Sequence, residues 1–299
     1  MAVTDREMSS TTHAEFLPTV WADDTKDAIE YQEVLSKLVN TSYEDELSIG
    51  RILSIPLRAN YNTQTKTEGV SNTINFQSVP GSAANNQDVT VSTHEYAAAL
   101  LNAVVAAQSK YDERQRIAHG LGYALMRGVE ITISTLFQSF SQIVGTLGAD
   151  VTEANLRRSW QYLRDAGVTE NAAWIFGPAA VASMFGMDKL TSKDFSNASP
   201  AFETASLPNI LSYPGYVSNL LRAPAAGQTE CALLHKEAII LLRQVKPTVR
   251  EQFLIRNLAD GIVAYDLYTA VEAVWVAEAP AGDSDPTQGD YGAVLIRSA

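Results

Sequence analysis

A long polar segment sets the strictest limit on the fold of this chain of 299 residues. Between Asn60 and Ser92, 18 of 33 residues are Asn, Thr, Gln or Ser. A segment with so few apolar side chains cannot bury enough surface to form a core of its own. Loops of this length are uncommon in compact domains and usually have a function or a partner. Because short β-prone pieces occur at 73–76 and 89–91, we expect an extended β-hairpin, and the alternative is a disordered surface loop.

The N-terminus is a second segment that cannot stabilise itself. The first fifty residues hold eleven acidic and three basic side chains, so they carry −8 of the net charge of −12. Apolar side chains such as Ile29, Val34 and Leu38 are too sparse there for a separate core. We interpret this segment as an arm that packs on another part of the protein or stays mobile.

The rest of the chain predicts a mixed α+β fold. Apolar residues recur every four positions from Ile117 to Phe137, which predicts a helix over 109–137. Glycines within it, the last of them Gly128, suggest a bend or the close approach of another element. Other apolar patterns predict strands over 49–57, 173–176, 263–275 and 291–296, helices over 152–167 and 179–185, and a loop region with short strands over 191–228.

No residue pattern typical of a catalytic or metal site occurs. The histidines at positions 13, 94, 119 and 235 have none of the zinc-ligand spacings. Cys231 lies in an apolar run, so we expect a buried and unreactive thiol. Serine-hydrolase and dinucleotide-binding motifs are missing, and residues 283–287 match only the start of a calcium loop, which leaves a loose surface calcium site open. We predict no enzymatic activity, no cofactor and no metal.

Charge and hydropathy narrow the function classes further. Acidic residues outnumber basic ones by 34 to 22, which argues against a nucleic-acid grip, because phosphate binding needs clustered Lys and Arg. The longest apolar stretch, 96–107, is shorter than the roughly 20 residues of a membrane-spanning helix. The N-terminal residues do not have the pattern of a signal peptide, and a single cysteine fits a reducing, cytosolic origin.

Several short motifs follow one another in a recognisable order. They are Gly50–Pro56 before the polar segment, Glu68–Gly69 within it, Val89–Val91 after it, the helix from Ser109, the Trp160–Gly167 region before 173–178, and Leu234–Ala238 before the closing strands. In this order and spacing they resemble the major capsid proteins of tailed bacteriophages, in particular podovirus-type coat proteins. The resemblance runs across nearly the whole chain. It implies a tailed-phage major capsid fold with an N-terminal arm, an extended β-hairpin called the E-loop, a long spine helix, an axial domain and a peripheral domain.

The resemblance also implies where these parts begin and end. Residues 1–48 correspond to the N-terminal arm, 49–96 to the E-loop hairpin, 97–149 and 263–299 to the peripheral domain with the spine helix, and 150–262 to the axial domain. Residues 191–228 are then expected near a fivefold or sixfold axis, and the acidic turn at 278–292 where three capsomers meet.

A protein of this family assembles, as pentamers and hexamers, into an icosahedral shell around double-stranded DNA, without sequence-specific DNA binding. The expected location is the virion capsid, assembled in the cytoplasm of a bacterial host. The expected partners are other copies of the chain, a separate scaffolding protein, a portal and, in some members, a decoration protein. A cellular nanocompartment shell with a packaged enzyme is an alternative within the same fold. A soluble α/β enzyme with a site in the 191–228 loops is an alternative from another class.

Five charged residues are predicted to contact neighbouring subunits. Each lies on an element that the resemblance places in a projecting or spanning position, and for each the alternative is an ordinary solvated surface charge. They are Arg58, Lys66, Glu68, Arg116 and Arg127.

Overall fold

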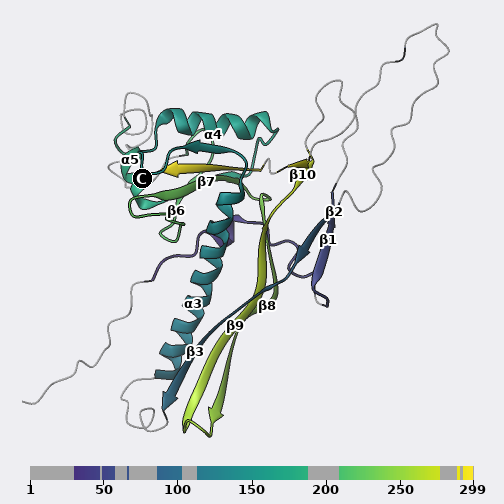
Figure 1. Ribbon diagram of the computed structural model, residues 1–299, viewed down its shortest axis with the longest axis vertical. Helices are drawn as coiled ribbons and strands as arrows, with labels where there is room; N and C mark the ends of the chain where they lie inside the picture. The colour runs from purple at the N-terminus through teal and green to yellow at the C-terminus, as the bar shows by residue number, and fades with distance from the viewer. Residues whose placement is uncertain are drawn as a thin grey trace, which may run out of the picture. The chain divides into compact units, whose positions relative to one another are not determined.

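Figure 1 shows a computed structural model of the chain, which describes residues 30–47, 49–57, 66, 86–102, 113–187, 209–276, 288–289 and 292–298. The chain divides into two units, Met1–Glu30 and Tyr31–Ala299, and every element described below belongs to the second. Among the described residues, the strands form sheets of five, three, two and two members, with α-helices beside them. The predicted α+β class is confirmed.

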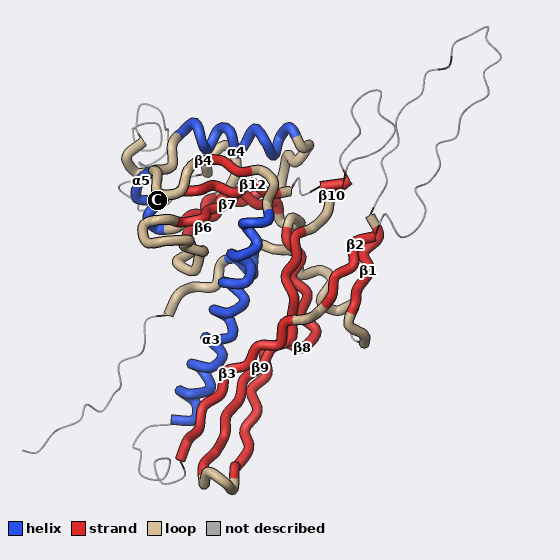
Figure 2. Tube along the Cα trace, viewed as in Figure 1, coloured by secondary structure: helices blue, strands red, loops and turns tan. Residues whose placement is uncertain are grey.

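Three long antiparallel strands form one sheet, visible as the long red strands in Figure 2. Their order is β3 (Thr93–Asn102), β9 (Ala259–Glu272) and β8 (Ile239–Leu254). The pairing of β8 with β9 has two irregularities of register on either side of Val245. Pro247 lies beside them, and its missing N–H cannot complete a regular ladder.

The long helix predicted from the four-residue spacing is α3 (Glu113–Thr135), which a short 3-10 helix, η3 (Leu136–Ser139), continues. Residues 103–112, including the predicted start of the helix, lie outside the described residues. The predicted apolar side of the helix is buried, with exposed fractions of 3% or less at Leu125, Val129, Ile133 and Phe137. α3 runs along the three-stranded sheet (Figure 1).

Gly128 shows the close approach that its place in the helix suggested. A Cβ atom there would collide with the carboxylate of Glu95, which projects from β3 toward the helix. Gly120 and Gly122 have open space around them, so neither is required by a close neighbour.

The five-stranded sheet has the order β4 (Ile143–Gly145), β12 (Ala293–Ser298), β7 (Thr229–His235), β5 (Ala172–Phe176) and β6 (Gly215–Val217). All five residues of β5 are buried, as expected for a central strand without a solvent face. Trp174 donates its indole N–H to the Ile210 carbonyl oxygen at 2.9 Å, so this large buried ring has no unsatisfied polar atom.

Two helices pack against this sheet with ends that the sequence predicted. In α4 (Glu153–Asp165), the Thr152 hydroxyl accepts a hydrogen bond from the Asn155 N–H, and Gly167 follows with a φ of +82°. In α5 (Pro178–Met184), proline occupies the first helical position. Both helix predictions and the 173–176 strand prediction are confirmed.

The remaining elements are short. β1 (Ile52–Pro56) pairs antiparallel with β2 (Asn86–Thr90), and β10 (Trp275–Val276) pairs with β11 (Gln288–Gly289). α1 (Leu35–Leu38) precedes β1. The predictions for 1–29, 73–76, 191–208 and most of 278–292 lie outside the described residues.

Both large sheets combine ranges that the sequence analysis assigned to different domains. β12 comes from the range expected in the peripheral domain, but it pairs with β7, from the range expected in the axial domain. β8 comes from the axial range, but it pairs with β9 along its whole length. Strand pairing depends on contacts between distant parts of the chain, which a linear division of the sequence does not contain.

The strand predicted from residue 263 is confirmed as β9, which ends at Glu272, and its buried face includes a charged side chain. Val263, Tyr265 and Leu267 share one face, and all are partly exposed. The opposite face, which contains Ala264, Asp266 and Tyr268, has no measurable exposure at these three residues. A carboxylate therefore occupies the more buried side of the strand.

Candidate assembly surfaces

The β1–β2 pair is a narrow ribbon with one anchored side. Val89 and Val91 pack with Leu47 and Leu242 in a small apolar cluster, against which Leu53 also packs. On the other side of β1, Ile52 is 58% exposed. A two-stranded ribbon is marginally stable alone, so the anchored side holds it and the exposed side is available for contact.

Gln87 ties this ribbon to the end of β9. Its side-chain amide donates to the Glu272 carbonyl oxygen at 2.6 Å and accepts from the Val274 N–H at 2.9 Å. The nitrogen and the oxygen of the Gln87 amide thus each bond to the backbone of one residue at or just after the end of β9. The two bonds fix the start of β2 beside that end.

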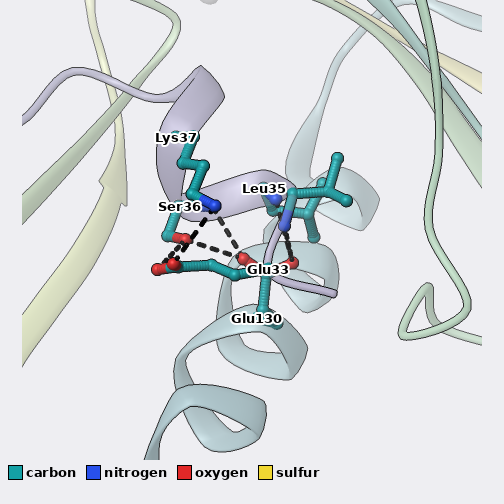
Figure 3. Close-up of polar contacts among 6 residues, drawn as sticks. Glu33, Leu35, Ser36, Lys37 and Glu130 are labelled. Carbon is teal, nitrogen blue, oxygen red and sulfur yellow. Dashed lines mark hydrogen bonds and ion pairs between the residues drawn. The ribbon is translucent and has the colours of Figure 1, made fainter. Parts of the chain in front are cut away.

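Glu130 on α3 holds residues 34–36, which lie within the predicted N-terminal arm (Figure 3). Its carboxylate accepts backbone N–H bonds from Leu35 at 2.9 Å and Ser36 at 2.8 Å, and a longer one from Val34 at 3.3 Å. The Ser36 hydroxyl also donates to it at 2.8 Å. Glu130 is fully buried, and the free N–H groups at the start of α1 provide the donors that a buried carboxylate needs.

Apolar packing reinforces this attachment. Leu35 and Val39 are almost completely buried in a cluster that contains Val129 and Ile133 of α3 and Leu234 of the five-stranded sheet. The prediction that the N-terminal segment packs on another part of the protein is confirmed for residues 34–39.

The turn between β8 and β9 exposes an unusual amount of apolar surface. Ile255 is 81% exposed and Leu258 is 67% exposed, and Phe253 beside them is 49% exposed. Single exposed apolar residues are ordinary, but several within one tight turn are typical of a contact surface.

Arg114 at the start of α3 braces this turn. Its guanidinium forms ion pairs with Glu251 of β8, at 3.2 Å, and with Asp260 of β9, at 2.5 Å. The two carboxylates come from the two strands that the turn joins, so one side chain of the helix holds both strands.

The face of the three-stranded sheet opposite α3 also carries exposed apolar side chains. Tyr96 and Leu100 of β3 are 71% and 56% exposed. Tyr96 lies opposite Tyr265 in the register, and His94 makes an edge-to-face contact with the same Tyr265 ring.

The five predicted contact residues are only partly covered by the structure. Lys66 is described and exposed, and Arg116 and Arg127 are exposed on α3. Arg58 and Glu68 lie outside the described residues. Arg116 and Arg127 lie on α3, whereas Lys66 belongs to the polar segment between β1 and β2. The role of all three in contacts between subunits stays a prediction.

The candidate residues for catalysis or metal binding lie in surroundings typical of ordinary core and surface residues. Cys231 is fully buried, and burial raises the pKa of its thiol, so the predicted inert thiol is confirmed. Burial lowers the pKa of His235, an effect that nearby Glu237 opposes. His119 is an exposed residue of α3. Within the described ranges, no group of three or more His, Cys, Asp or Glu side chains is arranged to hold a metal ion. None of the helices described is long and apolar enough to cross a membrane.

Comparison by sequence finds neither a matching protein-family model nor a matching curated protein. Comparison by structure finds matches over nearly the whole chain. A chain from Mycobacterium phage Che8 is 18% identical with a TM-score of 0.71, and the match covers 94% of this chain and 97% of that chain. A chain from the capsid structure of Cyanophage P-SCSP1u is 12% identical with a TM-score of 0.71, covering 95% and 94%. A chain from the mature capsid of bacteriophage PhiM1 is 12% identical with a TM-score of 0.68, covering 97% and 94%.

This chain has the fold of tailed-phage capsid proteins. The resemblance stated from the order of motifs is confirmed at the level of the fold.

Sequence reasoning missed the residues that organise these surfaces. Glu130 and Arg114 act across long sequence separations, and nothing near either residue points to its partner. Ile255 and Leu258 did leave a signal, because they follow Phe253 and Leu254 in a short, mostly apolar run between the charged residues Glu251 and Asp260. That signal marks an apolar turn and could have been found.

Proposed function

We propose that this chain is the major capsid protein of a tailed phage, which assembles as pentamers and hexamers into an icosahedral shell around double-stranded DNA. The observation that supports this is the match to chains of phage capsids over more than nine-tenths of both partners. A match of this extent involves the ribbon and the long helix as well as the cores, so it concerns the projecting elements that a shell needs. The same reasoning supports a structural rather than an enzymatic role.

The parts of the capsid fold follow the sheets in this proposal. Residues 49–96, with β1 and β2 at the base, form the E-loop, and α3 is the spine helix. The three-stranded sheet with α3 forms the peripheral domain, and the five-stranded sheet with α4 and α5 forms the axial domain. This keeps the predicted parts but assigns β4, β8 and β12 by the strands with which they pair.

The contacts between subunits are proposed to use the exposed apolar surfaces first. The Ile255–Leu258 turn and the Tyr96 face offer area that loses water on contact, and burial of apolar area drives association. Lys66, Arg116 and Arg127, with Arg58 and Glu68, are proposed to set register through charge pairs. Such pairs contribute more to specificity than to affinity.

The proposed partners are other copies of the chain, a separate scaffolding protein, a portal and, where present, a decoration protein. The enclosed DNA is held without a specific site. The net charge of −12 supports this, because tight phosphate binding needs an excess of basic side chains. The proposed location is the virion capsid, after assembly in the bacterial cytoplasm.

Electron microscopy of the protein from its native source, with the ultraviolet absorbance of the same fraction, tests the proposal. Uniform icosahedral particles with a nucleic-acid-rich spectrum are expected. Particles filled with a cargo protein would instead favour the nanocompartment alternative. A small soluble species that never assembles would overturn the shell function and return attention to the 191–228 loops.

A further inference from the structure

A row of four charged side chains crosses the buried face of the three-stranded sheet. Glu95 of β3 and Asp266 of β9 lie directly opposite each other in the register, and Glu95 projects toward α3. Arg243 of β8 forms an ion pair with Asp266 at 3.8 Å. Glu44, from the turn after α1, interacts electrostatically with Arg243 at the far end of the row. Like charges directly opposite on neighbouring strands destabilise a sheet, so this arrangement needs an explanation.

Several polar atoms of this row have no hydrogen-bond partner among the described residues. Asp266 has no measurable solvent exposure, and within the described residues neither of its carboxylate oxygens has a hydrogen-bond partner. The same holds for the Arg243 Nε and for one carboxylate oxygen of Glu44. At 3.8 Å, the contact between Arg243 and Asp266 is longer than a charge-assisted hydrogen bond. Arg243 therefore interacts with two carboxylates, those of Asp266 and Glu44, and its Nε has no hydrogen-bond partner among the described residues.

The surroundings leave Asp266 no better partner. From α3, the Thr132 hydroxyl lies 3.0 Å from the Tyr268 hydroxyl, and the Glu95 carboxylate lies against the backbone at Gly128. The turn after α1 adds Glu44 and Asp45, and β8 adds Lys246 near Glu44. A buried carboxylate with this set of neighbours is stabilised most simply by a proton of its own.

We propose that the row formed by Glu44, Arg243, Asp266 and Glu95 is a proton-operated device, in which uptake of a proton by Asp266 seats α3 on the three-stranded sheet and its loss loosens that contact. The device belongs to the folded subunit and does not rest on the shell function. It makes the packing of α3 depend on pH. In the five-stranded sheet, by contrast, the buried carboxylate of Glu230 is paired with Arg222 at 2.8 Å and lies opposite Arg297, a residue of the opposite charge.

The electrostatic balance supports this direction. Burial raises the pKa of Asp266, and the negative charges of Glu95 and Glu44 raise it too, against the opposing effects of Arg243 and the nearby Leu267 N–H. The folded state then holds the proton to a higher pH than the unfolded chain, whose aspartate titrates near about 3.9. Stability from this group is full below the unfolded pKa and falls as the pH rises through the folded pKa.

Amide hydrogen exchange of the full chain, corrected for the chemical exchange rate, tests the proposal between about pH 4, near the unfolded pKa, and about pH 8. Protection of α3 and β9 amides is expected to fall about tenfold for each unit by which the Asp266 pKa is raised. Protection of β5 and β7 amides is expected to stay constant and serves as the internal control. Asp266→Asn should remove the dependence, and Asp165→Asn, at an exposed residue of α4, should leave it as in the wild type.

Two neighbouring substitutions make the test specific to the row. Glu95→Gln removes a charge that raises the Asp266 pKa, so the midpoint of the change in protection should move to lower pH. Arg243→Gln removes a charge that lowers it, so the midpoint should move up. A purely structural role for these residues predicts no such opposite displacement.

The wild-type exchange profile needs no variant to fold. A flat profile for α3 and β9 across the pH range would overturn the proposal. So would an Asp266→Asn variant whose protection is lowered equally at all pH values, because that result identifies Asp266 as an ionised partner of Arg243.

Discussion

The two large sheets of this protein differ in how their apolar and polar side chains are buried and paired. In the five-stranded sheet, β5 is buried along its whole length. The polar side-chain group of β5, the Trp174 N–H, donates to the Ile210 carbonyl oxygen. In the three-stranded sheet, one face buries the unsatisfied Asp266, and the other exposes Tyr96 and Leu100. In the first sheet, the buried carboxylate of Glu230 is also paired, with Arg222 at 2.8 Å. The second sheet has an exposed apolar face and a buried carboxylate that has no hydrogen-bond partner among the described residues.

The largest expected effect concerns the ribbon. Replacing residues 58–85 by a short Gly-Ser turn keeps β1 and β2, whose pairing ends at Pro56 and Asn86. The subunit is expected to fold with unchanged helix content, because the anchored side of the ribbon is intact. Shell formation is expected to be lost, as measured by sedimentation and electron microscopy. Normal shells from this variant would contradict the proposed role of the hairpin.

The core of the self-sufficient sheet should respond most in stability. Trp174→Ala removes a fully buried indole that stacks on Phe176 with ring centroids 5.7 Å apart. Denaturant unfolding is expected to show a loss of about 3–5 kcal/mol. The matched change in the other sheet, Tyr96→Ala, is expected to cost less than about 0.5 kcal/mol, because that ring is largely exposed. Equal losses at the two sites would remove the contrast drawn between the sheets.

The attachment of residues 34–36 to Glu130 should rank next in its effect on stability. Glu130→Gln keeps the size of the side chain but replaces one accepting oxygen by an amide that donates, opposite N–H groups that also donate. The expected loss in the free energy of unfolding is about 2–3 kcal/mol. Glu153→Gln, at a surface ion pair with Arg157, is the control and should cost about 0.5 kcal/mol or less.

The smallest effect on the subunit is expected at the apolar turn. Ile255→Ser with Leu258→Asn removes exposed aliphatic surface, and Asn tolerates the φ of +44° at position 258 better than Leu. Unfolding should stay within about 0.5 kcal/mol of the wild type. The protein concentration needed for shells should rise, as followed by light scattering. Unchanged assembly would show that this turn is not a subunit contact.

Much of the local structure was predictable because it depends on neighbours in sequence. The four-residue spacing from Ile117 to Phe137 specified α3, Thr152 and Gly167 specified the ends of α4, and Pro178 specified the start of α5. The order of motifs was enough to predict the capsid fold. The pairing of β8 with β9 and of β12 with β7 did not follow from the linear order, because either strand could pair with several others.

Local sequence was sufficient to specify the helices, the acidic N-terminus and the long polar segment, since periodicity, capping and composition act over a few residues. The folded chain alone defines which strands pair, that Glu130 receives the N–H groups of residues 34–36, and that Asp266 lies buried opposite Glu95. Each of these contacts joins residues that are far apart in the chain. Its energy depends on burial and on the geometry of both partners, and neither is defined until the chain has folded.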